Sequence, residues 1–185
     1  MSHTIKDLVT AYGNKVIDNR RYLHAHPELS FQETDTAHWI REHLSAAGIP
    51  ILDGISGNST VGYLSGSQPG PSIGLRADID ALGLTEESDF PFKSTKPGVM
   101  HACGHDGHTA ILLAAAKHLS ETRNFSGTVH FVFQPAEENL GGAYKMVADG
   151  LFERFPMDGI YALHNWPGLP VGHVGLSSGA MMASL

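Results

Sequence analysis

The sequence contains a single cysteine and no long apolar run, and each scarcity excludes a class of protein. Cys103 alone cannot form an intramolecular disulfide, so the free thiol suits a reducing compartment and is a candidate metal ligand or nucleophile. No apolar segment approaches the ~20 residues of a membrane-spanning helix. Met1 to Asp7 lacks the pattern of a signal peptide. We therefore expect a cytoplasmic protein with no membrane partner.

Basic residues are also scarce. The 12 Lys and Arg residues are outnumbered by 19 Asp and Glu residues, which gives a formal net charge of -7. This balance, with no basic run, argues against a nucleic-acid partner and favours a small organic substrate. The 185 residues, of which 42% are hydrophobic, suffice for one sizeable globular domain but not for two.

The richest stretch in ligand chemistry runs from Met100 to His108, MHACGHDGH, with three His, one Asp and the only Cys. A single glycine separates Cys103 from His105, so the backbone can turn and bring both side chains to one ion. An alanine-rich apolar run follows, which indicates that the cluster lies where a loop becomes a helix. A helix N-terminus lowers the pKa of a nearby thiol and favours the thiolate that a metal binds. The plainer alternative is a small buried Cys beside surface histidines.

Hydrophobic periodicity predicts two helices before the first strand. The first runs from Ile5 to about His26 and ends at Pro27. The second follows a capping-box spacing of Ser30 and Glu33 and ends at Gly48. We expect both helices to have a structural role. His24 and His26, two residues apart on the first helix, point to different sides and are not expected to bind a common ion.

Strands and helices alternate in the remainder of the chain. We expect a hairpin of strands 60–64 and 72–77, a long irregular segment 81–99, helix 106–121, strand 128–133, helix 141–149, strand 158–163 and a last strand 171–176. Strand 72–77, helix 106–121 and strand 128–133 form one βαβ unit. The second unit comprises strand 128–133, helix 141–149 and strand 158–163. Such crossovers predict an α/β domain with a parallel sheet.

Polar side chains follow the carboxyl ends of three predicted strands. These residues are Asp78 and Asp80, then Glu137 and Glu138, then His164, while Cys103 and His105 begin the helix at the same edge. Parallel α/β sheets bind ligands at this edge, so we expect one joint site.

The residue types in this joint site indicate a transition ion such as Zn²⁺ or Mn²⁺. A thiolate is too soft a ligand for Mg²⁺ or Ca²⁺. Adjacent Glu137 and Glu138 diverge on an extended backbone, so one can bind the ion while the other takes a proton from water held by the ion. Alternatively, one of the two is merely an acidic residue at a helix N-terminus.

These motifs resemble the M20 metallopeptidases, and within them the amidohydrolase branch of hippurate hydrolases, N-acyl-amino-acid amidohydrolases and plant auxin-conjugate hydrolases. The resemblance runs from about Arg20 to Leu176. Its most specific pieces are RADIDAL at 76–82, MHACGHDGH at 100–108, FQPAEE at 133–138 and Leu163-His164, in that order, with RYLHAHPEL at 21–29 as weaker support.

The resemblance implies a three-layer, zinc-exopeptidase-like α/β domain with a mostly parallel sheet flanked by helices and incomplete at its C-terminus. It implies that Cys103, His105, Glu138 and His164 bind one or two divalent transition ions, Zn²⁺ or Mn²⁺, and that Glu137 is the general base. Asp80 would support the metal site from behind its ligands. His101 and His108 flank the ligands without an assigned role.

The resemblance further implies that residues 1–185 are the N-terminal portion of the catalytic metal-binding domain. Family members continue into a lid and dimerisation domain and then return to the catalytic domain with one more metal-binding histidine. We expect the full-length protein to be a homo-oligomer that cleaves the amide bond of N-acyl amino acids or related hippurate-like conjugates. Two alternatives are a truncated, non-catalytic metal-binding domain and a hydrolase with Cys103 as nucleophile.

Overall fold

The computed structural model describes residues 4–52, 55, 57–139, 141–179 and 181, so the first three residues of the N-terminal segment lie outside it. The elements, in chain order, are α1 (Ile5–Ala25), α2 (Thr34–Ala46), β1 (Ile51–Leu52), β2 (Thr60–Ser65), β3 (Gln68–Asp78), α3 (His105–Thr122), β4 (Ser126–Gln134), α4 (Gly142–Ala148), α5 (Leu151–Arg154) and β5 (Gly159–Ala162). Both predicted N-terminal helices and the long irregular segment after β3 are confirmed. The sequence did not reveal the short elements β1 and α5.

The strands form one sheet in the order β1-β2-β4-β3-β5. β3 pairs in parallel with both β4 and β5, whereas β2 is antiparallel to β4 and to β1. Among the described strands, therefore, only β2 runs against the others. Both predicted βαβ units and the mostly parallel sheet are confirmed.

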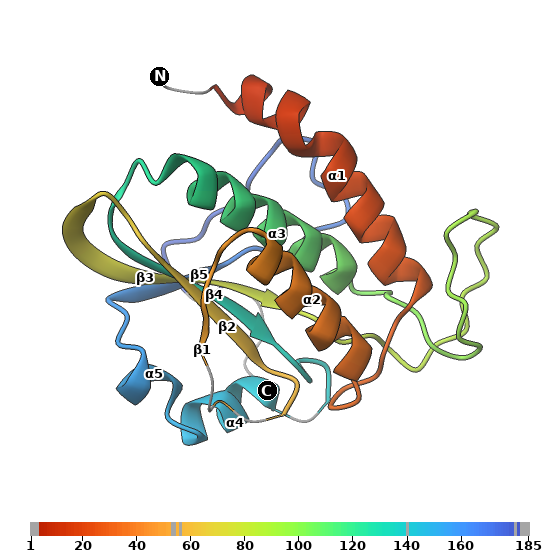
Figure 1. The fold of residues 1–185 in the computed structure, drawn as a ribbon. Coiled ribbons are helices and arrows are strands. Elements are labelled where there is room, and N and C mark those ends of the chain that lie inside the picture. The colour runs from red at the N-terminus through yellow and green to blue at the C-terminus, as the bar shows by residue number, and fades with distance from the viewer. Residues whose placement is uncertain (1–3, 53–54, 56, 140, 180, 182–185) are drawn as a thin grey trace.

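Helices cover both faces of the sheet, which gives three layers (Figure 1). α2 and α3 pack on one face, with α1 against α3, while α4 and α5 lie on the other. Side chains of β4 alternate between the two cores. Phe131 and Phe133 join the α2 and α3 side, and Val132 joins Met146 and Leu151 on the α4 and α5 side. A strand buried on both faces explains the nearly continuous apolar run in the sequence.

The predicted hairpin of the second and third strands is wrong. β2 and β3 flank β4, and Ser65 and Ser72 both lie opposite Thr128. The connection between β2 and β3 bonds to the start of β4 instead of closing on itself, since the Gly66 amide donates to the Gly127 carbonyl at 2.9 Å. A Cβ at Gly127 would overlap the carbonyl oxygen of Pro71, so this crossing requires glycine.

The predicted capping box of α2 is also wrong. The N-cap residue Glu33 makes no side-chain capping bond. Instead, the Glu28 carboxylate accepts from the amide of Thr36 at 2.8 Å and from that of Asp35 at 3.4 Å. The side chains of Ser30 and Glu33 point elsewhere, to the ends of β3 and β4.

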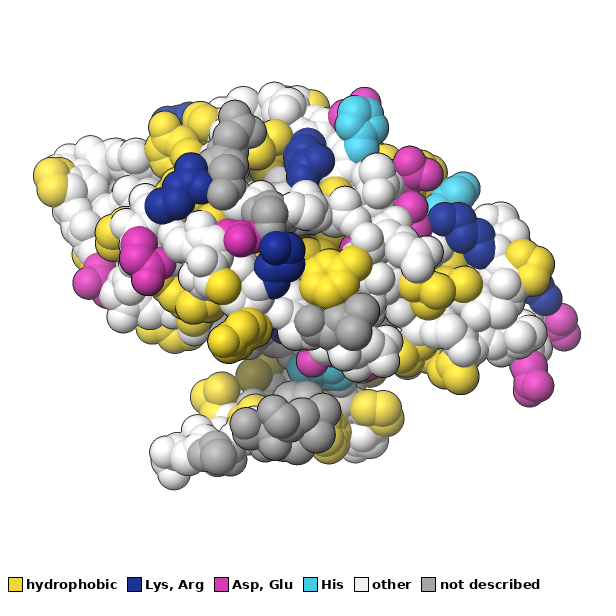
Figure 2. Space-filling model, turned by 90° about the horizontal axis from the view of Figure 1, so that it is seen from below, with side chains coloured by type: hydrophobic (Ala, Val, Ile, Leu, Met, Phe, Trp, Pro, Cys, Tyr) yellow, Lys and Arg dark blue, Asp and Glu magenta, His cyan; other side chains and the backbone are white. Residues whose placement is uncertain are grey.

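The predicted strand 171–176 is absent from the described chain, which forms turns after β5. Val171, Val174 and Leu176 are almost fully exposed. Gly172 has a φ of +84°, and no described strand lies beside this segment to take up its backbone hydrogen bonds. Hydrophobic side chains also remain exposed on the face that carries α4 and α5, which Figure 2 shows. On α4, the side chain of Tyr144 is 83% exposed.

None of the helices in the described ranges has both the length and the apolar character needed to cross a membrane.

Replacing Gly127 by Ala should destabilise the fold, because the residue has a φ of +88° and the new Cβ would overlap Pro71. We expect the free energy of unfolding to fall by about 2–4 kcal/mol. The matched control is Gly13→Ala in α1, where the nearest atom to the new Cβ is Val9 Cγ1 at 3.8 Å and a gain of about 0.5–1 kcal/mol is expected. Urea unfolding measures the free energy of unfolding of both variants. Equal changes in the two variants would contradict the close contact between Gly127 and Pro71.

Candidate metal centre

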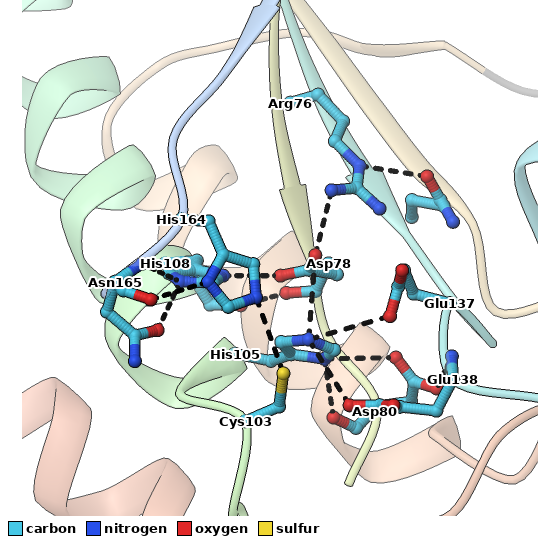
Figure 3. Close-up of polar contacts among 12 residues, drawn as sticks. Arg76, Asp78, Asp80, Cys103, His105, His108, Glu137, Glu138, His164 and Asn165 are labelled. Atoms are coloured by element: carbon cyan, nitrogen blue, oxygen red, sulfur yellow. Dashed lines mark hydrogen bonds and ion pairs between the residues drawn. The ribbon is translucent and has the colours of Figure 1, made fainter. Parts of the chain in front are cut away.

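Three strand ends and one helix start meet at the carboxyl edge of the sheet (Figure 3). β3 ends at Asp78 and leads to Asp80, β4 leads to Glu137 and Glu138, and β5 leads to His164. Cys103 and His105 approach from the start of α3. The parallel pairing that aligns Asp78 with Gln134 brings the first two of these loops side by side.

His105 lies at the centre of the site and is 1% exposed. Its Nδ1 lies 2.9 Å from the Asp80 carbonyl oxygen, which is an acceptor only, so Nδ1 carries the proton. Its Nε2 lies 3.6 Å from both Asp78 Oδ2 and Glu138 Oε1. His105 Nε2 and Glu138 Oε1 are both buried without a hydrogen-bond partner in the described chain. Such a pair fits a cation that both atoms can bind.

The remaining ligand candidates surround His105. Cys103 Sγ lies 3.4 Å from His164 Nε2. One ligand atom each from Cys103, His105 and His164 lie within 4.8 Å of one another, and the same holds for His105, Glu137 and Glu138. The other three predicted ligands and the predicted base therefore all lie near the imidazole of His105, the fourth predicted ligand. A third such group combines His105 with Asp78 and His108.

Asp80 contacts two of the predicted ligand residues, His105 and Glu138. Its Oδ1 lies 3.2 Å from His105 Nδ1, and its Oδ2 accepts from the amide of Glu138 at 3.1 Å and from Ser30 Oγ at 2.8 Å. Burial opposes the charge, but the bonds from His105 and Glu138 lower the pKa of Asp80 overall. Asp80 thus bonds to the side chain of one predicted ligand and to the backbone of another.

Asp78 forms a second set of buried polar contacts beside the predicted ligands. His108 Nδ1 lies 2.6 Å and Arg76 Nη1 2.8 Å from its carboxylate. Although burial acts in the opposite direction, His108, His105 and Arg76 lower the pKa of Asp78 to about 2. The amide of Asn165 donates to His108 Nε2 at 3.1 Å, which ties the segment of His164 to the end of β3. His108, which had no role in the sequence analysis, therefore connects two strand ends.

The expected lowering of the Cys103 pKa is wrong. Burial, followed by the carboxylate of Glu138, raises the pKa of this thiol to about 12. Cys103 precedes the N-cap residue Gly104, but burial and the negative charge of the nearby carboxylates outweigh the effect of the helix terminus on the thiol. The proton stays on sulfur at neutral pH unless a cation displaces it.

Other histidines lie outside the ligand cluster. His24 bonds to Asp106 at 2.7 Å, while exposed His26 bonds to the carbonyl of Tyr22. His101 is buried, its two ring nitrogens have no hydrogen-bond partner in the described part of the chain, and burial lowers its pKa to about 4. The capping-box spacing of Ser30 and Glu33 gave no indication that either side chain bonds to a loop of the site.

Three layers around a mostly parallel sheet, with thiol, imidazole and carboxylate groups at its carboxyl edge, define a class of α/β protein that can hold a metal at strand ends. Residues 74–179 match the model of peptidase family M20/M25/M40. The chain belongs to this family.

Relatives agree with this assignment. The chain is 47% identical to an N-acyl-L-amino acid amidohydrolase of Geobacillus stearothermophilus over 97% of its own length and 49% of the relative. It is 47% identical to the hippurate hydrolase of Campylobacter jejuni over 89% of its length and 43% of that protein. A Bacillus subtilis crystal structure, described as a dinuclear metal binding peptidase of family M20, superposes with a TM-score of 0.87 at 43% identity, over 92% of this chain and 48% of that one. The chain thus spans about half the length of these relatives.

Zinc affinity should rise with pH, because Zn²⁺ must displace the proton that the raised pKa of Cys103 keeps on sulfur. Each displaced proton increases the apparent association constant by about tenfold per pH unit. Titration calorimetry between about pH 6 and pH 8 measures this slope. Cys103→Ala should lower the slope by one proton, whereas exposed His26→Ala should not change it. An unchanged slope in Cys103→Ala would show that the thiol is not a ligand.

Proposed function

We propose that the protein is a metal-dependent amidohydrolase that cleaves the amide bond of N-acyl amino acids or related hippurate-like conjugates. Cys103, His105, Glu138 and His164 would hold Zn²⁺ or Mn²⁺, as one ion or two, and Glu137 would act as general base. The single observation that supports this most strongly is the buried pair of unpartnered atoms, His105 Nε2 and Glu138 Oε1, at 3.6 Å. The names of the two curated relatives support the substrate class.

Each residue of the site has a distinct task in this reaction. A bound divalent ion supplies electrophilic chemistry, since it lowers the pKa of water and polarises a carbonyl. Asp80 keeps the Nδ1 proton of His105 in place, which leaves the Nε2 lone pair directed into the site. The Glu138 backbone is held by Asp80, so its carboxylate has little freedom to turn away.

Glu137 is suited to move the proton. Its side chain is 42% exposed, and its Oε2 lies 3.8 Å from His105 Nε2, so it borders the site while remaining open to water. It would accept a proton from the attacking water as the carbon–oxygen bond forms. It would then return that proton to the amide nitrogen as the carbon–nitrogen bond breaks, giving a carboxylate and a free amine.

The alternative in which Cys103 is the nucleophile loses support from the electrostatics. A nucleophilic cysteine requires a thiolate near neutral pH, whereas burial and the surrounding carboxylates raise the pKa of Cys103 to about 12. The cytoplasmic location and the self-association of the full-length protein stay predictions.

In the full-length protein, Glu137→Gln should keep its metal and lose about 10²–10⁴-fold in kcat, because the variant binds no proton at this position. Glu138→Gln should lose the metal itself. Metal content measured beside hydrolysis of an N-acyl amino acid separates the two roles. A chelator should abolish the wild-type activity.

Glu153→Gln, at an exposed position on α5, is the matched control and should resemble the wild type. If Glu137→Gln retains near-normal turnover, or loses metal as readily as Glu138→Gln, the assigned roles are wrong. Turnover that persists in chelator would support the cysteine alternative. A full-length protein that binds metal without hydrolysing any N-acyl amino acid would favour a non-catalytic metal-binding domain.

A further inference from the structure

The connection between α1 and α2 contains a buried carboxylate that no ligand role accounts for. Glu33 is 0% exposed. Its Oε1 accepts from the amide of Ala136 at 2.8 Å, and its Oε2 accepts from Asn58 Nδ2 at 3.1 Å. Within the described ranges, no Lys, Arg or His side chain forms an ion pair with it. Burial of a carboxylate is costly, so these hydrogen bonds are its compensation.

Ala136, whose amide donates to Glu33, has an unusual backbone conformation. Its φ is +51°, in the left-handed region that residues other than glycine rarely adopt. Its carbonyl accepts from the amide of Gly142 at 2.9 Å, so both sides of the residue are fixed. Glu137 and Glu138 follow directly. The turn at Ala136 therefore sets the direction in which both glutamates leave β4.

The same connection also holds the loop after β3. Ser30 Oγ donates to Asp80 Oδ2 at 2.8 Å, and the Glu28 carbonyl accepts from the amide of Ala81 at 2.8 Å. The Asp80 carboxylate in turn accepts from the amide of Glu138. Segment 28–33 thus contacts both loops of the site, although it contributes no ligand.

We propose that Glu33 is a positioning residue for Glu137 and Glu138. Its carboxylate keeps the left-handed turn at Ala136 in place, and through this turn it keeps the two glutamate side chains directed toward His105. The roles of Glu137 as base and Glu138 as ligand rest on the proposed function. The effect of Glu33 on the Ala136 backbone does not.

Glu33→Ala tests the proposal by removing the acceptor of the Ala136 amide. We expect hydrogen exchange at this amide to accelerate by at least ~10-fold. Zn²⁺ affinity, measured by titration calorimetry, should fall by about 10-fold. In the full-length protein, kcat for an N-acyl amino acid should fall by roughly 10–100-fold, with a much smaller change in KM.

Two further substitutions separate hydrogen bonding from charge, and they apply even if Glu33→Ala does not fold. Glu33→Gln keeps an acceptor oxygen within reach of Ala136, and the amide of Asn58 can turn to accept from the new side chain. Glu33→Asp keeps the charge but withdraws the oxygen by one methylene. We expect Gln to restore most of the exchange protection, Zn²⁺ affinity and kcat, and Asp to restore less. The reverse order would overturn the proposal.

Glu28→Ala is the matched control, since it removes another buried carboxylate of the same connection. It should expose the amide of Thr36 to exchange and lower the melting temperature while Ala136 protection, Zn²⁺ affinity and kcat remain those of the wild type. An equal loss of kcat and Zn²⁺ affinity in Glu28→Ala would show a general stability effect and contradict positioning. Positioning would also be contradicted if exchange at the Ala136 amide were faster in Glu33→Ala while Zn²⁺ affinity and kcat were unchanged. If Glu137→Gln keeps its turnover, the proposed base is wrong, yet exchange and Zn²⁺ affinity still decide the role of Glu33.

Discussion

Parallel pairing of β3 with β4 determines where the parts of the site lie. The register places Asp78 beside Gln134, and the amide of Ile79 still donates to the Gln134 carbonyl at 3.0 Å beyond the last ladder pair. The segments that follow β3 and β4 therefore leave the sheet at the same level. Asp80 follows one strand and Glu138 the other, close enough for the carboxylate of Asp80 to accept from the amide of Glu138. A shift of one residue in this register would reverse the side chains of β3 relative to both helix layers.

Buried charge at this edge is distributed between supports and ligand candidates. Asp80 and Asp78 each accept several hydrogen bonds and have lowered pKa values, so they are satisfied by the protein itself. His105 Nε2 and Glu138 Oε1 have no such partners in the described chain. This contrast distinguishes groups that the fold has already compensated from groups that still need a partner. A divalent cation is the partner that suits both a nitrogen lone pair and a carboxylate oxygen.

The sequence predicted the βαβ units and the metal-competent edge because both follow from local patterns. Apolar runs of strand length reveal buried strands, and the residues after each run must lie at the sheet edge. The position of β2 depends instead on pairing between distant segments. A short turn between β2 and β3 suggested a hairpin, whereas close contacts at Gly127 direct the chain across the start of β4. Glu33 matched a capping pattern, and only the tertiary structure shows that its carboxylate bonds to Ala136.

The Cys103 thiol shows why a local rule failed at the site. A helix terminus provides a partial positive charge, and in a neutral setting it would favour the thiolate. Here burial has the largest effect and raises the pKa of the thiol, and the negative charges of Glu138, Asp78 and Glu137 raise it further. The carboxylates of Asp80, Asp78 and Glu138 raise the pKa of His105 despite its burial. Protons and metal cations therefore compete for the same negative field, so the charge that disfavours a free thiolate is also the charge that attracts a divalent ion.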